Sequence, residues 1–308
     1  MRVWITADVH HGNPGSKGVT RELAGHFLSN AERDDVLVLA GDIGEIDGIG
    51  LRECLGEFAR FPGVKALVPG NHDLWTHPGS GQGTWHHYRA VLPRIAAEHG
   101  FQMLDVAPLR VALPHGGALG IAGSYGGYDF TMADVGALAS DADRSEVLQA
   151  FRVGRFRTFV WSDYTFFWDR DGAFDLADFS RSCTAKLEQD VRGLQDDPAI
   201  TAIAIITHTG GHIDVVRDHP LGLDKPLVAN VWFHGVAGTV RIGEIAMESD
   251  KVRLVACGHT HHDREVLDEA GRCWINVGCN YSRKRWVAWD PAGGVQVSRW
   301  FGDAAAMW

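Results

Sequence analysis

The sequence predicts an α/β fold, because short apolar runs rich in β-branched residues alternate with stretches of helical length. The apolar runs span residues 3–6, 36–40, 64–68, 201–206 and 252–257, and each has the length and composition of a buried strand. Helical stretches occupy residues 18–30, 51–61 and 85–99. Polar loops follow the strands, and in open α/β folds such loops gather at the carboxyl edge of a sheet, where ligands bind.

A short polar motif follows each of the five predicted strands. In chain order these motifs are ADVH with Asp8 and His10, AGD with Asp42, GNHD with Asn71, His72 and Asp73, ITHT with His208, and GHTH with His259 and His261. Aspartate, histidine and asparagine without cysteine make a donor set of hard to intermediate character. Such a set suits Mn²⁺, Fe or Zn²⁺ better than a thiolate site or an oxygen-only Ca²⁺ site.

Each motif also has an ordinary structural explanation. A single aspartate after a strand usually forms a turn or caps a helix. GNHD alone fits an Asx turn, and ITHT alone fits the end of a strand. These explanations must hold for all five motifs at once, and a shared metal centre is the more economical interpretation.

At these residues the sequence resembles the calcineurin-like metallophosphoesterase superfamily, whose motifs run DxH, GD, GNH(D/E), H and GHxH. The resemblance extends from residue 1 to about residue 288 and is firm at the motifs. It implies a fold of two packed mixed β-sheets flanked by helices, in four layers α-β-β-α. It also implies two metal sites: Asp8, His10 and His261 bind one ion, Asn71, His208 and His259 bind the other, and Asp42 bridges them.

The resemblance further implies the chemistry of a phosphoesterase. Two divalent or trivalent ions (Mn, Fe or Zn) would lower the pKa of a water between them and neutralise charge on the phosphoryl oxygens. His72 would protonate or stabilise the leaving oxygen. Asp73, its neighbour, is expected to orient the His72 imidazole through a hydrogen bond.

A single domain over residues 1–308 is expected, because the proposed ligands extend from Asp8 to His261 and 45% of the residues are hydrophobic. The segment 126–198 is an aromatic-rich insertion between the GNHD and ITHT motifs. Its aromatic residues form either a local core or a lid or substrate pocket, and the sequence leaves both open.

Four further residues are candidate substrate contacts. Tyr125 and Tyr128 follow a strand-like run at residues 118–122 and lie nearest a sheet edge. His212 stands in THTGGH, where two glycines allow a close approach of the loop. Arg283 belongs to the basic turn NYSRKRW, which offers charge to an anionic group or is simply a solvated turn.

Composition limits the partners. The chain has 29 Lys and Arg against 39 Asp and Glu, a formal net charge of -10, and no long basic block, so an extended nucleic-acid partner is not expected. The five cysteines lack CxxC spacing and are typical of free thiols in a reducing compartment. No signal-like start and no apolar run of membrane-spanning length stands out, so a cytoplasmic protein without a membrane partner is expected. Oligomeric state is not predicted.

Three functions remain open. The first is a dinuclear metal-dependent phosphoesterase that hydrolyses a small-molecule phosphate ester, either a monoester or a diester. The second is a macromolecular phosphoesterase, a protein phosphatase or a nuclease. The third is a non-catalytic binding module on the same fold. All seven metal-ligand candidates and His72 are present, which favours catalysis, and the acidity of the chain counts against a nuclease.

Overall fold

The computed structural model describes residues 1–81, 83–170, 174–216, 226–297 and 300–302. Its first large sheet has the strand order β15 (Gly294–Val297), β14 (Val287–Asp290), β1 (Val3–Thr6), β2 (Val36–Ala40), β3 (Val64–Val68) and β4 (Gln102–Met103). Strands β1 to β4 run parallel, and β14 and β15 are antiparallel to their neighbours.

The second large sheet has the order β11 (Arg264–Leu267), β12 (Cys273–Asn276), β10 (Val252–Cys257), β9 (Ile200–Thr207), β6 (Ala118–Ser124) and β5 (Leu109–Ala112). Its four central strands are parallel, and β5 and β11 are antiparallel edges. Two small ribbons pair β13 (Arg283–Lys284) with β16 (Phe301–Gly302) and β7 (Arg155–Phe156) with β8 (Phe159–Val160).

Helices connect the strands. The α-helices are α1 (Lys17–Asn30), α2 (Leu51–Glu57), α3 (Asn71–Leu74), α4 (Thr84–His86), α5 (Leu92–Glu98), α6 (Asp141–Val153), α7 (Asp163–Phe166), α8 (Leu176–Gln195), α9 (Pro226–Gly235) and α10 (Val240–Met247). Shorter 3-10 turns are η1 (Ile46–Gly48), η2 (Pro78–Ser80), η4 (Val135–Ala137) and η5 (Ile213–Val215), and η3 (His87–Val91) is a π-helical turn.

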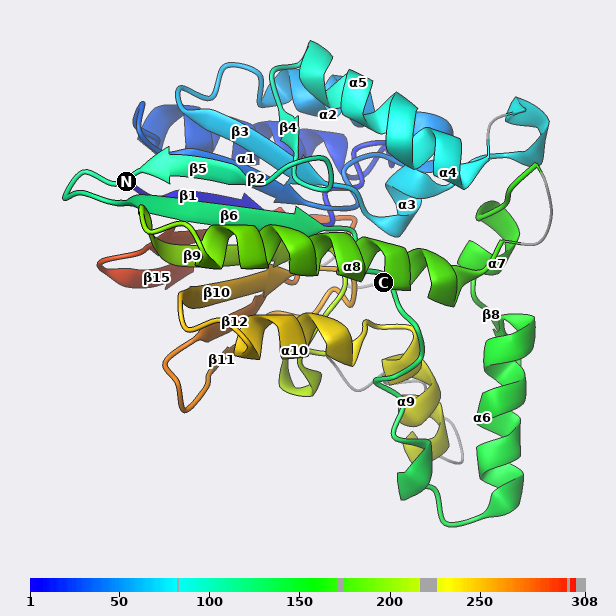
Figure 1. The fold of residues 1–308 in the computed structure, drawn as a ribbon. Helices are drawn as coiled ribbons and strands as arrows, with labels where there is room; N and C mark the ends of the chain where they lie inside the picture. Colours follow the sequence, from blue (N-terminus) through cyan, green and yellow to red (C-terminus); the bar gives the residue numbers. More distant parts are fainter. Residues whose placement is uncertain (82, 171–173, 217–225, 298–299, 303–308) are drawn as a thin grey trace.

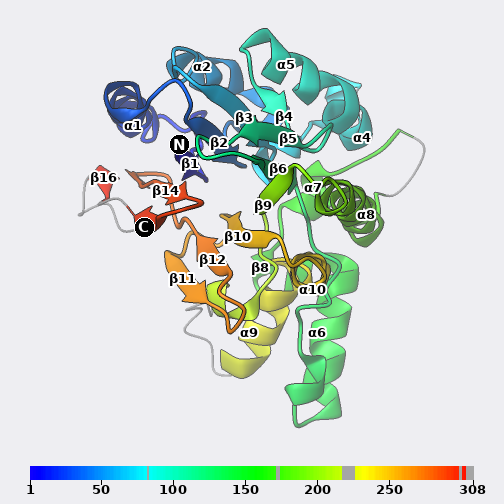
Figure 2. The ribbon, with the colours of Figure 1, turned by 60° about the vertical axis from the view of Figure 1, so that its left-hand side comes forward.

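The alternation of side chains along the strands builds four layers. In β1, Val3 and Ile5 point into the core between the two sheets, where they meet residues of β6 and β9 such as Ile121. Trp4, between them, points to the opposite face and packs with Phe27 of α1. Figures 1 and 2 show α1, α2 and α5 over the first sheet and α8 and α10 over the second. The predicted four-layer fold is confirmed.

The predicted elements match the structure closely at the strands. Four of the five predicted strands have the observed bounds, and the fifth, β9, is longer by one residue at each end. The helix expected at residues 51–61 ends earlier, at Glu57, where Ala59 and Phe61 donate to Gly56 and Phe58 in tight turns. The helix expected at residues 85–99 is a succession of α4, η3 and α5.

The aromatic-rich segment 126–198 divides into two parts. Its last helix, α8, packs against β6 and β9 and is one of the layers of the fold. The earlier part, with α6 and the β7–β8 ribbon, projects beyond the sheets beside α9 (Figure 1). Only this earlier part is therefore an addition to the layered core.

The buried carboxyl group of Asp105, two residues after β4, makes the free energy of unfolding depend on pH. Asp105 accepts hydrogen bonds from the Tyr125 amide at 2.7 Å and the Tyr88 hydroxyl at 2.8 Å, and its burial raises its pKa to about 7. In the unfolded chain an aspartate ionises near pH 3.9. The contribution of the neutral Asp105 carboxyl to the free energy of unfolding is therefore complete below about pH 3.9 and is lost as the pH rises towards 7.

We accordingly expect Asp105→Asn to stabilise the protein at neutral pH, because asparagine keeps an acceptor oxygen and cannot ionise. The difference in Tm between the variant and the wild type should grow by several degrees from pH 5 to pH 8. Thermal unfolding at both pH values measures it. A difference that stays constant with pH would show that Asp105 is not the titrating group.

Candidate metal centre

The five polar motifs meet at one edge of the molecule. This edge is formed by the carboxyl ends of β1, β2 and β3 of the first sheet and of β9 and β10 of the second, which are the right-hand ends of these strands in Figure 1. The loops that follow carry all seven predicted metal ligands, and each of these residues lies within 4 Å of at least one other. The two sheets thus contribute to one site.

The backbone at this edge adopts an uncommon conformation. Positive φ angles occur at Asp8 (49°), His10 (48°), Asp42 (49°), His259 (71°) and His261 (52°). The left-handed region costs about 1 to 3 kcal/mol for a residue other than glycine, and such strain gathers at functional sites. Five of the seven ligand candidates therefore hold a strained conformation that turns their side chains towards a common point.

The first ligand group contains Asp8, His10, Asp42 and His261, whose potential ligand atoms all lie within 4.8 Å of one another. His10 Nε2 lies 3.2 Å from His261 Nε2 and 3.6 Å from Asp42 Oδ2. His261 Nε2 lies 3.7 Å from Asp8 Oδ1, while Asp8 Oδ2 is buried without a hydrogen-bond partner. Two carboxylates and two imidazoles at these distances form a cage for a cation.

The second group contains Asn71, His208 and His259, and it reaches Asp42 from the other side. Asn71 Oδ1 lies 3.0 Å from His208 Nε2 and 3.2 Å from His259 Nδ1. His208 Nε2 is also 3.4 Å from Asp42 Oδ1. Asp42 therefore directs one oxygen to each group.

Hydrogen bonds fix which nitrogen of each histidine is free to bind a metal. His208 Nδ1 donates to the Ala40 carbonyl at 3.1 Å, and His259 Nε2 donates to the Val236 carbonyl at 3.0 Å. The other nitrogen of His259, Nδ1, faces Asn71 Oδ1 at 3.2 Å. Both atoms are acceptors, and acceptors that point at one another need a cation between them, so the donor set fits a metal ion.

The pKa values of the histidines in the two ligand groups also indicate that the site attracts positive charge. Burial lowers the pKa of His10 and of His261, and it lowers that of His259 to about 3, which keeps these imidazoles neutral and able to donate a lone pair. Burial opposes protonation of His208 too, yet Asp42 raises its pKa to about 9. The point beside Asp42 and His208 thus favours a cation strongly.

The glycines in the motifs are explained by close approach. A Cβ atom on Gly70 would lie 2.0 Å from Asp42 Oδ1, and one on Gly41 would lie 2.3 Å from His208 Nδ1. Both contacts are far inside van der Waals distance and involve proposed ligands. The glycines of GD and GNH therefore give the ligands of neighbouring loops room to meet.

We expect Gly70→Ala to lower the metal content, because the new methyl group displaces the Asp42 carboxylate. Gly18→Ala in α1 is a matched control, since nothing lies within 4 Å of the added Cβ there. Elemental analysis of both purified variants measures the effect. Equal metal content in the two variants would contradict the role given to Gly70.

His72 lies against the ligand cluster without belonging to it. Its Nδ1 donates to Glu45 Oε2 at 2.6 Å, and its Nε2 is 4.0 Å from Asp42 Oδ2. Burial would lower the pKa of His72, but Asp42 and Glu45 raise it to about 9. Glu45 also accepts from His10 Nδ1 at 3.1 Å, so one carboxylate holds both histidines. These two bonds, acting against burial, lower the pKa of Glu45 to about 2.

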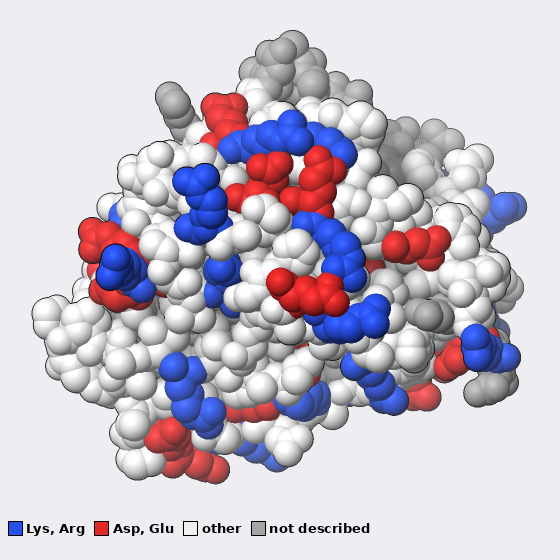
Figure 3. Space-filling view, turned by 90° about the horizontal axis from the view of Figure 1, so that it is seen from above, with Lys and Arg blue, Asp and Glu red and all other residues white. Residues whose placement is uncertain are grey.

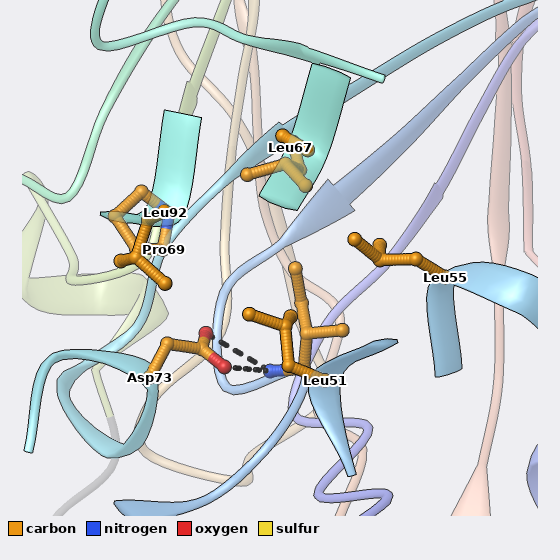
Figure 4. A pocket seen from close by; sticks show the side chains of 8 residues that line it. Leu51, Leu55, Leu67, Pro69, Asp73 and Leu92 are labelled. Carbon is orange, nitrogen blue, oxygen red and sulfur yellow. Dashed lines mark hydrogen bonds between the residues drawn. The ribbon is translucent and has the colours of Figure 1, made fainter. Parts of the chain in front are cut away.

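The prediction that Asp73 orients His72 is wrong. The Asp73 carboxylate accepts from the backbone amides of Ile43, Gly44 and Gly70 at 2.7 to 3.1 Å. Figure 4 shows it turned towards the Ile43 amide beside a small pocket lined by leucines. Asp73 therefore ties the loop of Asp42 to the loop of Asn71.

The four predicted substrate contacts differ in their positions. Tyr125 and Tyr128 are both 1% exposed and lie beside the ligand cluster, with ring centroids 6.4 Å from His208 and 6.2 Å from His259, so their contact with a substrate stays a prediction. His212 accepts from the Asp214 amide and packs against Trp274, and the Arg283 guanidinium lies over the Trp300 ring at 4.3 Å. None of these contacts joins His212 or Arg283 to the ligand cluster.

Residues missed by the sequence reasoning also border the cluster. Glu45 follows Asp42 by three residues, and a second carboxylate on the same loop was the available signal. Tyr281, 40% exposed, lies with its ring 4.3 Å from that of His10. The basic turn NYSRKRW was singled out from the sequence, and its residue that reaches the centre is Lys284, whose buried ammonium donates to the Asp8 carbonyl at 2.9 Å. Asp163 lies in the inserted segment, and no motif marks it.

Two features bear on the expected location. All five cysteines are buried free thiols. Among the described residues, no helix combines the length and the apolar character needed to cross a bilayer.

Comparisons with known proteins agree with this geometry. The calcineurin-like phosphoesterase family model matches residues 1–263. No curated protein matches the chain. Among solved structures, a phosphopantetheinyl hydrolase from Mycobacterium tuberculosis is similar with a TM-score of 0.65 at 19% identity, over 91% of this chain and 89% of that one.

Two further structures share the fold at lower similarity. A dimetal phosphatase from Danio rerio has a TM-score of 0.51 at 12% identity, over 98% of both chains. The Plasmodium protein described as the anchor in the inner membrane complex has a TM-score of 0.52 at 8% identity, over 100% of this chain and 86% of that one. At these identities the similarity concerns the fold alone, and the fold occurs both in a phosphatase and in an anchor.

Proposed function

Because this chain belongs to the calcineurin-like phosphoesterase family, and is thus a metal-dependent phosphoester hydrolase, we propose that it cleaves a small-molecule phosphate ester at a centre of two metal ions. The observation that carries the proposal is the position of Asp42. One of its oxygens lies 3.6 Å from His10 Nε2 and the other 3.4 Å from His208 Nε2. A carboxylate so placed suits a bridge between two ions.

Each ion would have its own ligands besides Asp42. Asp8, His10 and His261 would hold the first, and Asn71, His208 and His259 the second. The mixture of imidazole, carboxylate and amide donors favours Mn, Fe or Zn. Bound there, the metals would supply an activated water and offset charge on the phosphoryl oxygens.

His72 is the residue placed to handle the proton of the leaving group. Its Nδ1 proton is held by Glu45, so Nε2 is the atom that faces the centre. In the metal-free chain, Asp42 and Glu45 raise the pKa of His72 to about 9, and with metal ions on Asp42 the Glu45 carboxylate is the group that still favours a protonated imidazole. His72 can therefore donate from Nε2 to the departing oxygen while the other proton stays on Nδ1, hydrogen-bonded to Glu45.

Aromatic rings border the centre and support a small substrate. The Trp75 ring lies tilted against that of His72 with centroids 3.8 Å apart, the Trp161 ring lies 5.9 Å from that of His259, and the Tyr281 ring lies 4.3 Å from that of His10. Such rings restrict the space beside the metals and offer apolar contacts to a bound molecule.

Surface charge supports the same choice over nucleic acid. On the face seen in Figure 3, basic and acidic side chains are interspersed. Ion pairs between described residues, such as Lys17 with Glu53 and Arg52 with Glu98, further offset positive charge. This face has no continuous basic track of the kind that follows a phosphate backbone. The five unpaired thiols also fit the proposed cytoplasmic location.

A substrate panel tests the proposal. Bis(p-nitrophenyl) phosphate, p-nitrophenyl phosphate, a mixture of small nucleotide esters, single-stranded DNA and a phosphorylated protein are assayed with Mn²⁺ present. Faster turnover of a small ester than of either polymer is expected, and the preferred ester separates diesterase from monoesterase activity. Faster cleavage of DNA or of the phosphoprotein would replace the proposal by a nuclease or a protein phosphatase.

A phosphopantetheinyl ester is a second candidate substrate. It is favoured by the similarity to the phosphopantetheinyl hydrolase, which extends over most of both chains. Mass spectrometry of a phosphopantetheinylated protein incubated with the enzyme would detect the loss of that group. Complete retention of the group would exclude this candidate.

A further inference from the structure

The segment between β6 and β9 places a buried carboxylate beside the second ligand group. Asp163, at the start of α7, is 1% exposed. Its Oδ1 accepts from Asn71 Nδ2 at 3.1 Å and from Trp75 Nε1 at 2.7 Å, and its Oδ2 accepts from the Tyr128 hydroxyl. Within the described part of the chain, no Lys or Arg forms an ion pair with it. Burial without a cation is unfavourable, so its hydrogen bonds must compensate.

The bond to Asn71 determines which end of that amide faces the metal site. An amide has a donor end and an acceptor end, and a metal binds the oxygen. Because Asp163 presents an acceptor oxygen, the NH₂ group of Asn71 turns to it. Asn71 Oδ1 then points to His208 Nε2 and His259 Nδ1, at 3.0 and 3.2 Å.

Two neighbours from the same segment contact another residue of this group. Trp161 Nε1 donates to the Tyr128 hydroxyl at 2.6 Å, which places both rings on His259, with centroid distances of 5.9 and 6.2 Å. The first ligand group is bordered differently, by Glu45 at His10 and by Tyr281 at His10 and His261. The inserted segment thus adjoins the second group.

We propose that Asp163 is a positioning residue that orients Asn71 for the second metal, so that the inserted segment sets the affinity of that site and not of the first. This inference rests on the proposed dinuclear centre. It assigns to the segment a part in assembling the centre, in addition to any contact with substrate.

Binding of Mn²⁺ to metal-stripped protein, followed by isothermal titration calorimetry, tests the proposal without an activity assay. The wild type should bind two ions. In Asp163→Ala the Asn71 amide loses its acceptor and can turn, so one affinity should fall by about tenfold or more while the other stays within about twofold. Asp163→Asn, which keeps an acceptor oxygen, should restore most of the loss. Asp141→Ala is the control, because Asp141 is 96% exposed in the same segment.

If Asp163→Ala does not fold, a second pair of variants tests the positioning role of Asp163. Asn71→Asp alone sets a carboxylate against Asp163 and should weaken the second site, although a carboxylate is normally the stronger ligand. Adding Asp163→Asn should recover the affinity.

Several results would overturn the proposal. These are unchanged affinities in Asp163→Ala, an equal loss at both sites, or tighter binding in Asn71→Asp alone. A wild type that binds fewer than two ions would instead refute the dinuclear centre.

Discussion

Asp42→Asn is expected to lower turnover by about a thousandfold or more and to reduce the metal content below two ions per chain. The carboxylate is shared, since one oxygen faces His10 Nε2 at 3.6 Å and the other faces His208 Nε2 at 3.4 Å. Asparagine supplies one neutral oxygen in place of two charged ones, so both ligand groups lose negative charge. A thousandfold loss corresponds to about 4 kcal/mol of transition-state stabilisation, the scale expected for a metal centre.

Elemental analysis and kinetics on the preferred panel ester measure the two effects together. Asp141→Asn is a suitable control, because it makes the same substitution at an exposed carboxylate that forms a pair with Arg144. If Asp42→Asn retained two ions per chain and turnover within tenfold of the wild type, Asp42 would not be the bridging ligand.

His72→Ala is expected to lower turnover by about a hundredfold to ten-thousandfold and to leave the metal content unchanged. The His72 ring contacts Glu45 and the tilted ring of Trp75, and its Nε2 is 4.0 Å from Asp42 Oδ2. Its removal therefore takes away a proton donor but no proposed ligand. Elemental analysis beside steady-state kinetics separates the two roles, and loss of metal in this variant would show that His72 is a ligand.

Two further variants, Glu45→Gln and His212→Ala, give reference points for the loss of turnover in His72→Ala. Glu45→Gln keeps a hydrogen-bond acceptor for the His72 Nδ1 proton but loses the charge, so its turnover should fall between those of the wild type and His72→Ala. His212→Ala, at a residue that contacts Asp214 and Trp274, should behave as the wild type. Full turnover in Glu45→Gln would contradict the role of Glu45 as the residue that orients His72.

The strands and the ligand cluster were predictable from the sequence, because both are encoded locally. Buried strands such as residues 36–40 are continuous apolar runs, and a polar residue that follows one must lie at the sheet edge. The family resemblance carried by these motifs then implied that Asp42 lies between the two ligand groups. Gly70 was visible as part of its motif. The reason why glycine is needed there, its close approach to Asp42, is seen only in the folded structure.

The partner of His72 was not predictable in this way. Asp73 is adjacent in sequence, yet a neighbour on a helical turn points to a different side, and its carboxylate is taken by three backbone amides. Glu45 reaches His72 because the β2 and β3 loops lie side by side, a consequence of strand pairing between β2 and β3.

The hydrogen bonds of Tyr128 and the place of Asp163 beside Asn71 were not predictable for a related reason. Tyr128 follows a strand end, as the ligands do, but its hydroxyl bonds to Asp163 and its ring is buried against His259. Asp163 is 92 residues from Asn71, and the pairing of a carboxylate with a distant amide leaves no periodic or local signal. Side chains that act through another residue are found only once the chain is folded.

Anomalous diffraction from a crystal grown with Mn²⁺ locates the two metal ions that we propose on either side of Asp42. Two anomalous peaks are predicted, about 3.5 to 4 Å apart, one beside His10 and His261 and the other beside Asn71 and His208. A single peak, or a peak only at another candidate group such as His11, Glu53 and Glu57, would contradict the dinuclear centre.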